Sequence, residues 1–134
     1  IDAKFINIGE LLVMLKIKFK FPKTVKVTFH KPCHLENDDF LKPLIDNCEN
    51  AEYIEMKDYD ECCGFAGEFA LKNNKISRTI AKNKAKNIKD TNAEYVITSC
   101  PGCELGLQQG LAGIIGGPKV LSLAAFLSKA EIKN

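Results

Sequence analysis

Five of the six cysteines in this chain lie in three short motifs whose spacing suits metal binding or redox chemistry. The central motif is CCGFAG at residues 62–67, with Cys33 upstream and a C-x-x-C motif at 100–103 downstream. The α-carbons of adjacent cysteines are only about 3.8 Å apart, so such cysteines rarely bond to each other. They can instead offer two thiolates to one metal centre. Gly64 and Gly67 let the backbone adopt a positive φ or approach a bulky inorganic group.

Three kinds of site are compatible with these cysteines. A zinc ion takes four tetrahedral ligands, so five cysteines together with His30 and His34 are more than one zinc site needs. Iron–sulfur clusters are held by cysteine thiolates, and a larger or irregular cluster could use all five. A thiol–disulfide pair of Cys100 and Cys103, in the manner of thioredoxin, would leave the other three cysteines unexplained. The iron–sulfur, zinc and dithiol hypotheses all stay open at this point.

The residues around the C-x-x-C motif predict that it opens a helix. Pro101 fits the first helical position, which makes Cys100 the N-cap residue. A helix N-terminus favours the thiolate form of cysteine and therefore metal ligation. Cys48 has no partner motif, and we expect it to be a small semi-buried residue or a free thiol. The cysteine spacing is not that of a disulfide framework, so we expect a cytoplasmic protein.

Length and composition limit the classes of protein that this chain can belong to. A chain of 134 residues is long enough for one compact domain. The net charge of +2 is too small to suggest a nucleic-acid binder. No apolar run approaches the roughly 20 residues of a membrane-spanning helix. The chain begins at Ile1 and not at methionine, which is expected of a fragment of a longer protein or of a processed protein.

Hydrophobic periodicity predicts the secondary structure. Apolar side chains recur at helical spacing over residues 5–15, and residues 17–21 alternate like a strand until Pro22 stops it. We expect residues 1–22 to be an N-terminal helix and extended linker within a single domain that spans residues 1–134. Strands are predicted at 24–30, 51–56, 94–99 and 119–122, and helices at 35–47, 74–89, 101–111 and 123–132.

The alternation of strands and helices predicts an α/β fold. We expect a four-stranded parallel sheet, in the order 2-1-3-4, with helices on both faces. In the helix at 74–89 the apolar side chains are expected to face the core and the basic ones to face solvent. The residues expected to face inward are Ile76, Ile80, Ala81, Ala85 and Ile88.

This topology brings the cysteine motifs together. Cys33 follows the first strand, Cys62 and Cys63 follow the second, and the C-x-x-C motif at 100–103 follows the third. Open α/β sheets place their ligand sites at the carboxyl ends of parallel strands. We therefore expect all three motifs to meet at one edge of the sheet. Cys48 precedes the second strand and should lie at the opposite edge.

Several polar residues near the motifs have simpler interpretations. His30 ends the first strand, and we expect a structural role for it. His34 is as compatible with a metal ligand, or a hydrogen-bond donor to a cluster sulfur, as with a residue that packs at a helix start. The acidic residues Asp58, Asp60 and Glu61 are expected to form a solvated loop.

The three motifs together resemble the CCG cysteine-rich domain family. The residues that carry the resemblance are HKPCHL at 30–35, CCGFAG at 62–67 and CPGC at 100–103, spaced as C-x28-CC-x36-C-x2-C. Asn87-Ile88 and Gly110-Leu111 also match, and the resemblance covers residues 25–127. This family includes one of the subunits of heterodisulfide reductase and the iron–sulfur subunits of glycolate- and lactate-oxidising complexes.

The resemblance implies a function and a set of ligands. It implies a non-cubane 4Fe–4S cluster or, for some CCG motifs, a zinc ion, in a subunit that transfers electrons or performs thiol–disulfide chemistry. It further implies glycolate or lactate oxidation with a flavoprotein partner, and a C-terminal fragment of a longer subunit. The implied ligands are Cys33, Cys62, Cys63, Cys100 and Cys103, and the implied surrounding residues are His34, Gly64, Gly67, Pro101 and Gly102.

Overall fold

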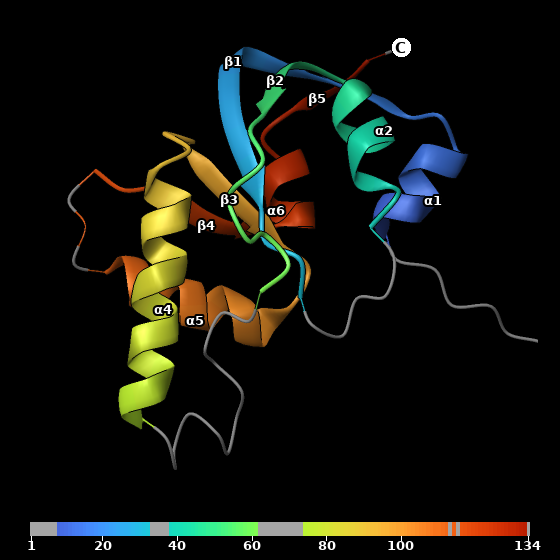
Figure 1. Ribbon diagram of the computed structural model, residues 1–134. Coiled ribbons are helices and arrows are strands. Elements are labelled where there is room, and N and C mark those ends of the chain that lie inside the picture. The colour runs from blue at the N-terminus through green and yellow to red at the C-terminus, as the bar shows by residue number, and fades with distance from the viewer. Residues whose placement is uncertain (1–7, 33–37, 62–73, 113, 115, 134) are drawn as a thin grey trace, which may run out of the picture.

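Among the residues that the structure describes, five strands form a mixed sheet with helices on both faces (Figure 1). The computed structural model describes residues 8–32, 38–61, 74–112, 114 and 116–133. The elements in chain order are α1 (Ile8–Met14), β1 (Lys18–Phe29), α2 (Leu41–Asp46), β2 (Cys48–Tyr53), α4 (Asn74–Lys89), β3 (Tyr95–Thr98), α5 (Pro101–Leu111), β4 (Lys119–Ser122), α6 (Leu123–Leu127) and β5 (Glu131–Lys133).

The strand order β2-β1-β3-β4 confirms the predicted parallel sheet. Val27 of β1 pairs with Tyr53 of β2 on one side and with Tyr95 of β3 on the other. β3 pairs in parallel with β4 along its whole length. The fifth strand was not predicted: β5 runs antiparallel to the start of β1, where Phe19 pairs with Ile132. The sheet is therefore parallel at its centre and mixed where the C-terminal strand joins it.

The predicted linker over residues 17–22 is wrong, because β1 runs through Pro22 without a break. Proline lacks an N–H group and is tolerated in a strand where the pairing is irregular. The register with β2 shifts between Lys20 and Val25, so Pro22 lies within that irregularity. Phe19 and Phe21 are buried there, and the lysines beside them are exposed. The alternation of buried and exposed residues that is typical of a strand therefore continues up to Pro22.

The predicted terminal helix over residues 123–132 is too long. α6 ends at Leu127, and the chain then turns into β5. Ser122 caps the start of α6, accepting a hydrogen bond from the backbone N–H of Ala125 at 3.1 Å. The segment after Leu127 has one large apolar residue, Ile132, so its own pattern favours no particular structure. Pairing with β1 gives its backbone groups partners and decides the outcome.

Two apolar clusters, one on each face of the sheet, form the core. Successive residues of a strand point to opposite faces, so Val96 and Ile97 of β3 belong to different clusters. Figure 1 shows α1, α2 and α6 on one side of the sheet and α4 and α5 on the other. The first cluster centres on Phe21, Val27, Phe29, Leu44 and Phe126, and the second on Ile88, Val96, Cys103, Leu107 and Val120. The predicted helices on both faces are confirmed.

The bounds predicted for α4 agree with the structure, but two of its side chains do not behave as expected. Ala85 and Ile88 are buried as predicted, whereas Ile76 is 55% exposed. Lys84, which was assigned no inward position, is only 3% exposed. The first turns of α4 extend beyond the sheet in Figure 1, so an apolar residue there lies away from the core beneath the sheet.

Candidate metal centre

The C-x-x-C motif begins α5 in the way that the sequence predicts. Cys100 is the N-cap residue, with an extended backbone at φ −123° and ψ 121°, and Pro101 occupies the first turn. The Cys100 Sγ accepts a hydrogen bond from the backbone N–H of Cys103 at 3.5 Å. A sulfur atom in this position faces the positive end of the helix dipole, which stabilises a thiolate.

The two thiols of this motif differ in exposure. Cys103 is 6% exposed and belongs to the apolar cluster with Val96 and Leu107, while Cys100 is half-buried and packs at the margin of that cluster. The two thiols are not joined in a disulfide. One sulfur therefore lies within the core layer beneath α5, and the other lies nearer the surface.

The described residues next to the other two motifs lie at the same end of the sheet. The backbone N–H of His30 donates to the carbonyl of Ile97 at 2.9 Å, which extends the pairing of β1 with β3. The next N–H, of Lys31, donates to the carbonyl of Tyr59 at 2.9 Å. Burial, followed by a hydrogen bond with Asp38, raises the pKa of Tyr59. The segments that lead into Cys33 and into Cys62 are thus bonded side by side.

Cys33, Cys62 and Cys63 themselves lie outside the described residues, as do His34, Gly64 and Gly67. The structure therefore brings together Cys100, Cys103 and the residues that precede the other motifs. The meeting of all five cysteines stays a prediction. Among the described residues alone, no group of three or more histidine, cysteine or acidic side chains could hold a metal ion.

Three buried polar side chains lie at the carboxyl ends of β1 and β3. Thr28, His30 and Thr98 have no exposed surface. Within the described part of the chain, their hydroxyl oxygens and both imidazole nitrogens have no hydrogen-bond partner. Buried polar groups almost always have a partner, so a set of three at a candidate site indicates that something polar belongs beside them. This is the feature expected of residues that surround a metal centre, and it fits an inorganic cluster.

Sequence reasoning assigned His30 only a structural role. A signal was present, however: Thr28 and His30 alternate along β1 onto one face, directly before the motif that contains Cys33. Polar residues at successive same-face positions of a buried strand need partners. Their position next to a cysteine motif could have identified them as candidates for the surroundings of the site.

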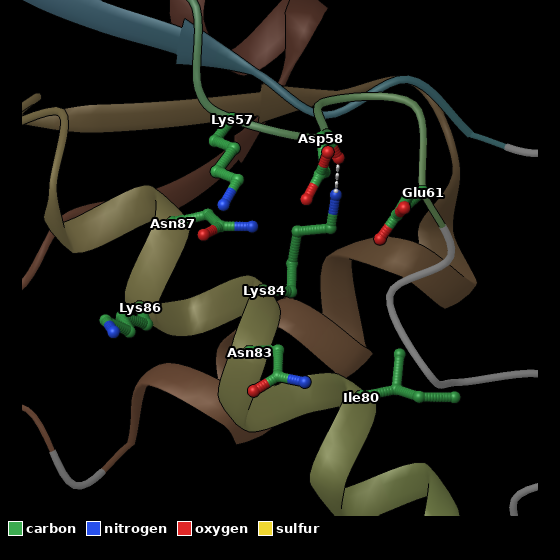
Figure 2. Close-up of a pocket in the computed structure, with 8 residues that line it drawn as sticks. All are labelled: Lys57, Asp58, Glu61, Ile80, Asn83, Lys84, Lys86 and Asn87. Carbon is green, nitrogen blue, oxygen red and sulfur yellow. Dashed lines mark hydrogen bonds between the residues drawn. The ribbon is translucent and has the colours of Figure 1, made fainter.

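A polar cavity of about 320 Å³ lies between α4 and the acidic loop that precedes Cys62 (Figure 2). Lys84 reaches across from α4, and its Nζ donates to the carbonyl oxygen of Asp58 at 2.5 Å. Asp58, Asp60 and Glu61 are exposed, which confirms the solvated loop. The missed signal for Lys84 was its position between Ile80 and Ile88 on one face of α4. Lys84 therefore connects the helix to the loop that enters the central cysteine motif.

Cys48 lies at the other end of the sheet. It is the first residue of β2, is 4% exposed, and its S–H donates to the carbonyl of Leu44 at 3.2 Å. Burial raises the pKa of this thiol from 9.0 to about 11. The predicted amino-edge position is confirmed, although β2 begins three residues earlier than predicted. Cys48 is a protonated core residue at neutral pH.

The fold and the cysteine motifs define a class of protein. The sequence matches the family described as CCG, cysteine-rich domain, over residues 27–108, which is more than half of the chain. The chain therefore belongs to the CCG cysteine-rich domain family.

The proteins that this chain is similar to include iron–sulfur proteins. A probable glycolate oxidase iron–sulfur subunit of Bacillus subtilis is 34% identical over 110 residues, which are 78% of this chain and 25% of that protein. One subunit of the fumarate reductase (CoM/CoB) of Methanothermobacter marburgensis is 30% identical over 137 residues, which cover 97% of this chain and 28% of that protein. An uncharacterized iron–sulfur protein of Methanococcus maripaludis is 34% identical over 112 residues, which cover 81% of this chain and 23% of that protein.

These comparisons separate the hypotheses that the sequence left open. This chain spans about a quarter of the length of each of these relatives. Two of the three are named as iron–sulfur proteins, which favours an iron–sulfur cluster and gives no support to zinc. None of the described helices has the length and apolar character that crossing a bilayer requires.

Proposed function

We propose that this chain holds an iron–sulfur cluster that carries electrons in a subunit of an oxidoreductase. The observation that carries the proposal is the C-x-x-C motif at the start of α5, with the segments leading to the other two motifs hydrogen-bonded at the same edge. Thiolates are the ligands that iron–sulfur clusters use. The proposed ligands are Cys33, Cys62, Cys63, Cys100 and Cys103.

The chain's own residues suit this task. The dipole of α5 stabilises the Cys100 thiolate, and Cys103 supplies a second sulfur from the core layer. Five thiolates exceed the four of an ordinary cubane, which supports a non-cubane 4Fe–4S cluster. We include Pro101 and Gly102 among the residues that shape its surroundings. When bound, such a cluster would accept and release electrons.

We further propose that the whole protein acts in glycolate or lactate oxidation, with a flavoprotein as the electron donor. The names of the relatives support this, since they include a probable glycolate oxidase subunit and lactate utilization protein A of Oceanobacillus iheyensis. Electrons taken from a hydroxy acid need a carrier between the flavin and the final acceptor, and a cytoplasmic iron–sulfur domain would serve as one. A dithiol reaction at Cys100 and Cys103 is the alternative for the same site.

The test is iron and sulfide content after anaerobic reconstitution, together with the visible absorption spectrum. Wild type should bind iron and inorganic sulfide, and Cys33→Ser, Cys63→Ser and Cys103→Ser should each lower that content. Cys48→Ser is the matched control, because Cys48 lies at the far edge of the sheet. A wild type without iron or sulfide would refute the cluster, and a redox-active thiol pair would then support the dithiol reaction. A normal cluster in Cys33→Ser would refute the ligand assignment.

A further inference from the structure

The side chains of Thr28, His30 and Thr98, which have no partner among the described residues, form one patch. The register pairs Thr28 with Val96 and Phe29 with Ile97, so the next pair along the two strands is His30 with Thr98. The hydrogen bond from the His30 N–H to the carbonyl of Ile97, at 2.9 Å, shows that the pairing continues this far. The three side chains are therefore neighbours at the carboxyl end of the two central strands.

The patch faces the layer that contains the C-x-x-C motif. Val27, Phe29 and Ile97 belong to the cluster beneath α2 and α6. Because strand side chains alternate, Thr28 and His30 point to the opposite face. Thr98 lies two residues after Val96 and shares its face, and Val96 packs in one cluster with Cys103. Figure 1 shows α4 and α5 covering that face.

The chemistry of the patch indicates what lies beside it. A neutral imidazole carries one N–H donor and one acceptor nitrogen, and each hydroxyl is both donor and acceptor. Valine or leucine would fill such positions without leaving a polar atom unpaired, so these residue types disfavour a plain core. Thiolate and sulfide sulfurs accept hydrogen bonds and carry the negative charge that attracts such donors.

We propose that His30 donates a hydrogen bond from its imidazole to a sulfur atom of the iron–sulfur cluster, with the Thr98 hydroxyl supporting it from the neighbouring strand. His30 is thus a positioning residue that acts on the redox centre without ligating iron. This inference rests on the proposed function, since it needs a cluster at the cysteine edge. It separates His30 from His34, the histidine that follows Cys33 directly.

The proposed hydrogen bond has one consequence for the reduction potential of the cluster and another for the melting temperature of the metal-free protein. Reduction adds negative charge to the cluster, and hydrogen bonds to its sulfurs stabilise that charge, so they raise the reduction potential. Removing the donor should therefore make the potential more negative. Without the cluster, the same groups are buried and find no partner in the described part of the chain. Thr98→Val, which keeps the shape of the side chain, should therefore not lower the melting temperature of the metal-free protein. A residue that merely supports the fold would show a lower melting temperature and an unchanged potential.

The experiment uses the full chain, reconstituted anaerobically and labelled with ¹⁵N in its two histidines. Electron–nuclear double resonance on the reduced cluster should detect a weak ¹⁵N coupling in wild type. The coupling should disappear in His30→Leu and persist in His34→Leu, and this pair of variants shows which of the two histidines couples to the cluster. A redox titration should give a more negative potential for His30→Leu at normal iron content, and His30→Gln, which keeps a donor, should return part of the shift.

The outcomes separate the two proposals. A wild type that binds no iron or sulfide overturns the proposed function, and this inference with it. A normal cluster without ¹⁵N coupling, or with coupling that is lost only in His34→Leu, overturns this inference alone. If His30→Leu fails to fold, the ¹⁵N coupling of the wild type and the reduction potential of Thr98→Val test the inference in its place. An unchanged potential with a lower melting temperature in Thr98→Val would give the patch a structural role and overturn the proposal.

Discussion

Replacing Gly110 with valine should destabilise the protein, because it forces apart two helices that touch backbone to backbone. Gly110 lies near the end of α5, against Ala81 of α4. A β-carbon added to Gly110 would lie 3.1 Å from the carbonyl oxygen of Ala81 and 3.6 Å from its β-carbon. The carbonyl belongs to a helix backbone and cannot rotate away as a flexible side chain could. The close crossing therefore leaves little room for a side chain at this position.

Two opposing effects give the magnitude. Overpacking a well-filled contact costs about 1–3 kcal/mol. Valine is a better helix former than glycine and returns a few tenths of a kcal/mol. The free energy of unfolding of Gly110→Val should thus fall by about 1–2 kcal/mol. Gly110→Ala should be nearly neutral, since the roughly 1 kcal/mol that alanine gains in helix propensity offsets the smaller displacement.

Urea denaturation of the metal-free chain measures this effect. Gly110→Val should lower the midpoint with an unchanged slope, which is the sign of lost stability without a change in the unfolded state. Gln108→Val is the matched control, because Gln108 is exposed on the same helix and its replacement should change stability by no more than about 0.5 kcal/mol. A Gly110→Val protein as stable as wild type would refute the close crossing of α4 and α5.

Two further predictions concern Lys84 and Cys48. Lys84→Met keeps the apolar stem but loses the hydrogen bond to Asp58, so it should cost about 1–2 kcal/mol and speed hydrogen exchange at the Lys31 amide, which bonds to the same loop. Exchange as slow as in wild type, or equal acceleration by Lys82→Met on the exposed face, would contradict this. The raised pKa of Cys48, about 11, means that its contribution to stability is complete below about pH 9 and is lost as the pH rises through 11. Between pH 8 and pH 10.5, Cys48→Ala should therefore lose less stability than wild type, and the difference should be at most about 2 kcal/mol. If the urea midpoints of the two proteins fall equally with pH, the raised pKa of Cys48 is refuted.

Features that depend on neighbouring residues in the chain were determined by the sequence alone. The bounds of α4 and β4 and the capping of α5 by Cys100 agree with the prediction. Alternating apolar and polar residues predict a strand, and an N-cap residue followed by proline predicts a helix start. Both patterns extend over only a few positions, so the sequence alone contains them. The strand order followed from the sequence of elements, because parallel strands joined by helices have few possible arrangements. The position of Cys48 at the amino edge followed from the same topology.

Features that depend on which surfaces meet were decided only by the tertiary structure. β5 exists because the end of the chain returns to pair with the start of β1, and β1 continues through Pro22 because Phe19 and Phe21 are buried beside it and the pairing there is irregular. Lys84 is buried because the loop carrying Asp58 passes over that part of α4 and supplies a carbonyl acceptor. The proposal for His30 has the same origin: its type and position were visible in the sequence, but its complete burial without a partner among the described residues is a property of the folded chain. Burial and hydrogen-bond satisfaction are sums over all the elements that surround a residue, so no local pattern contains them.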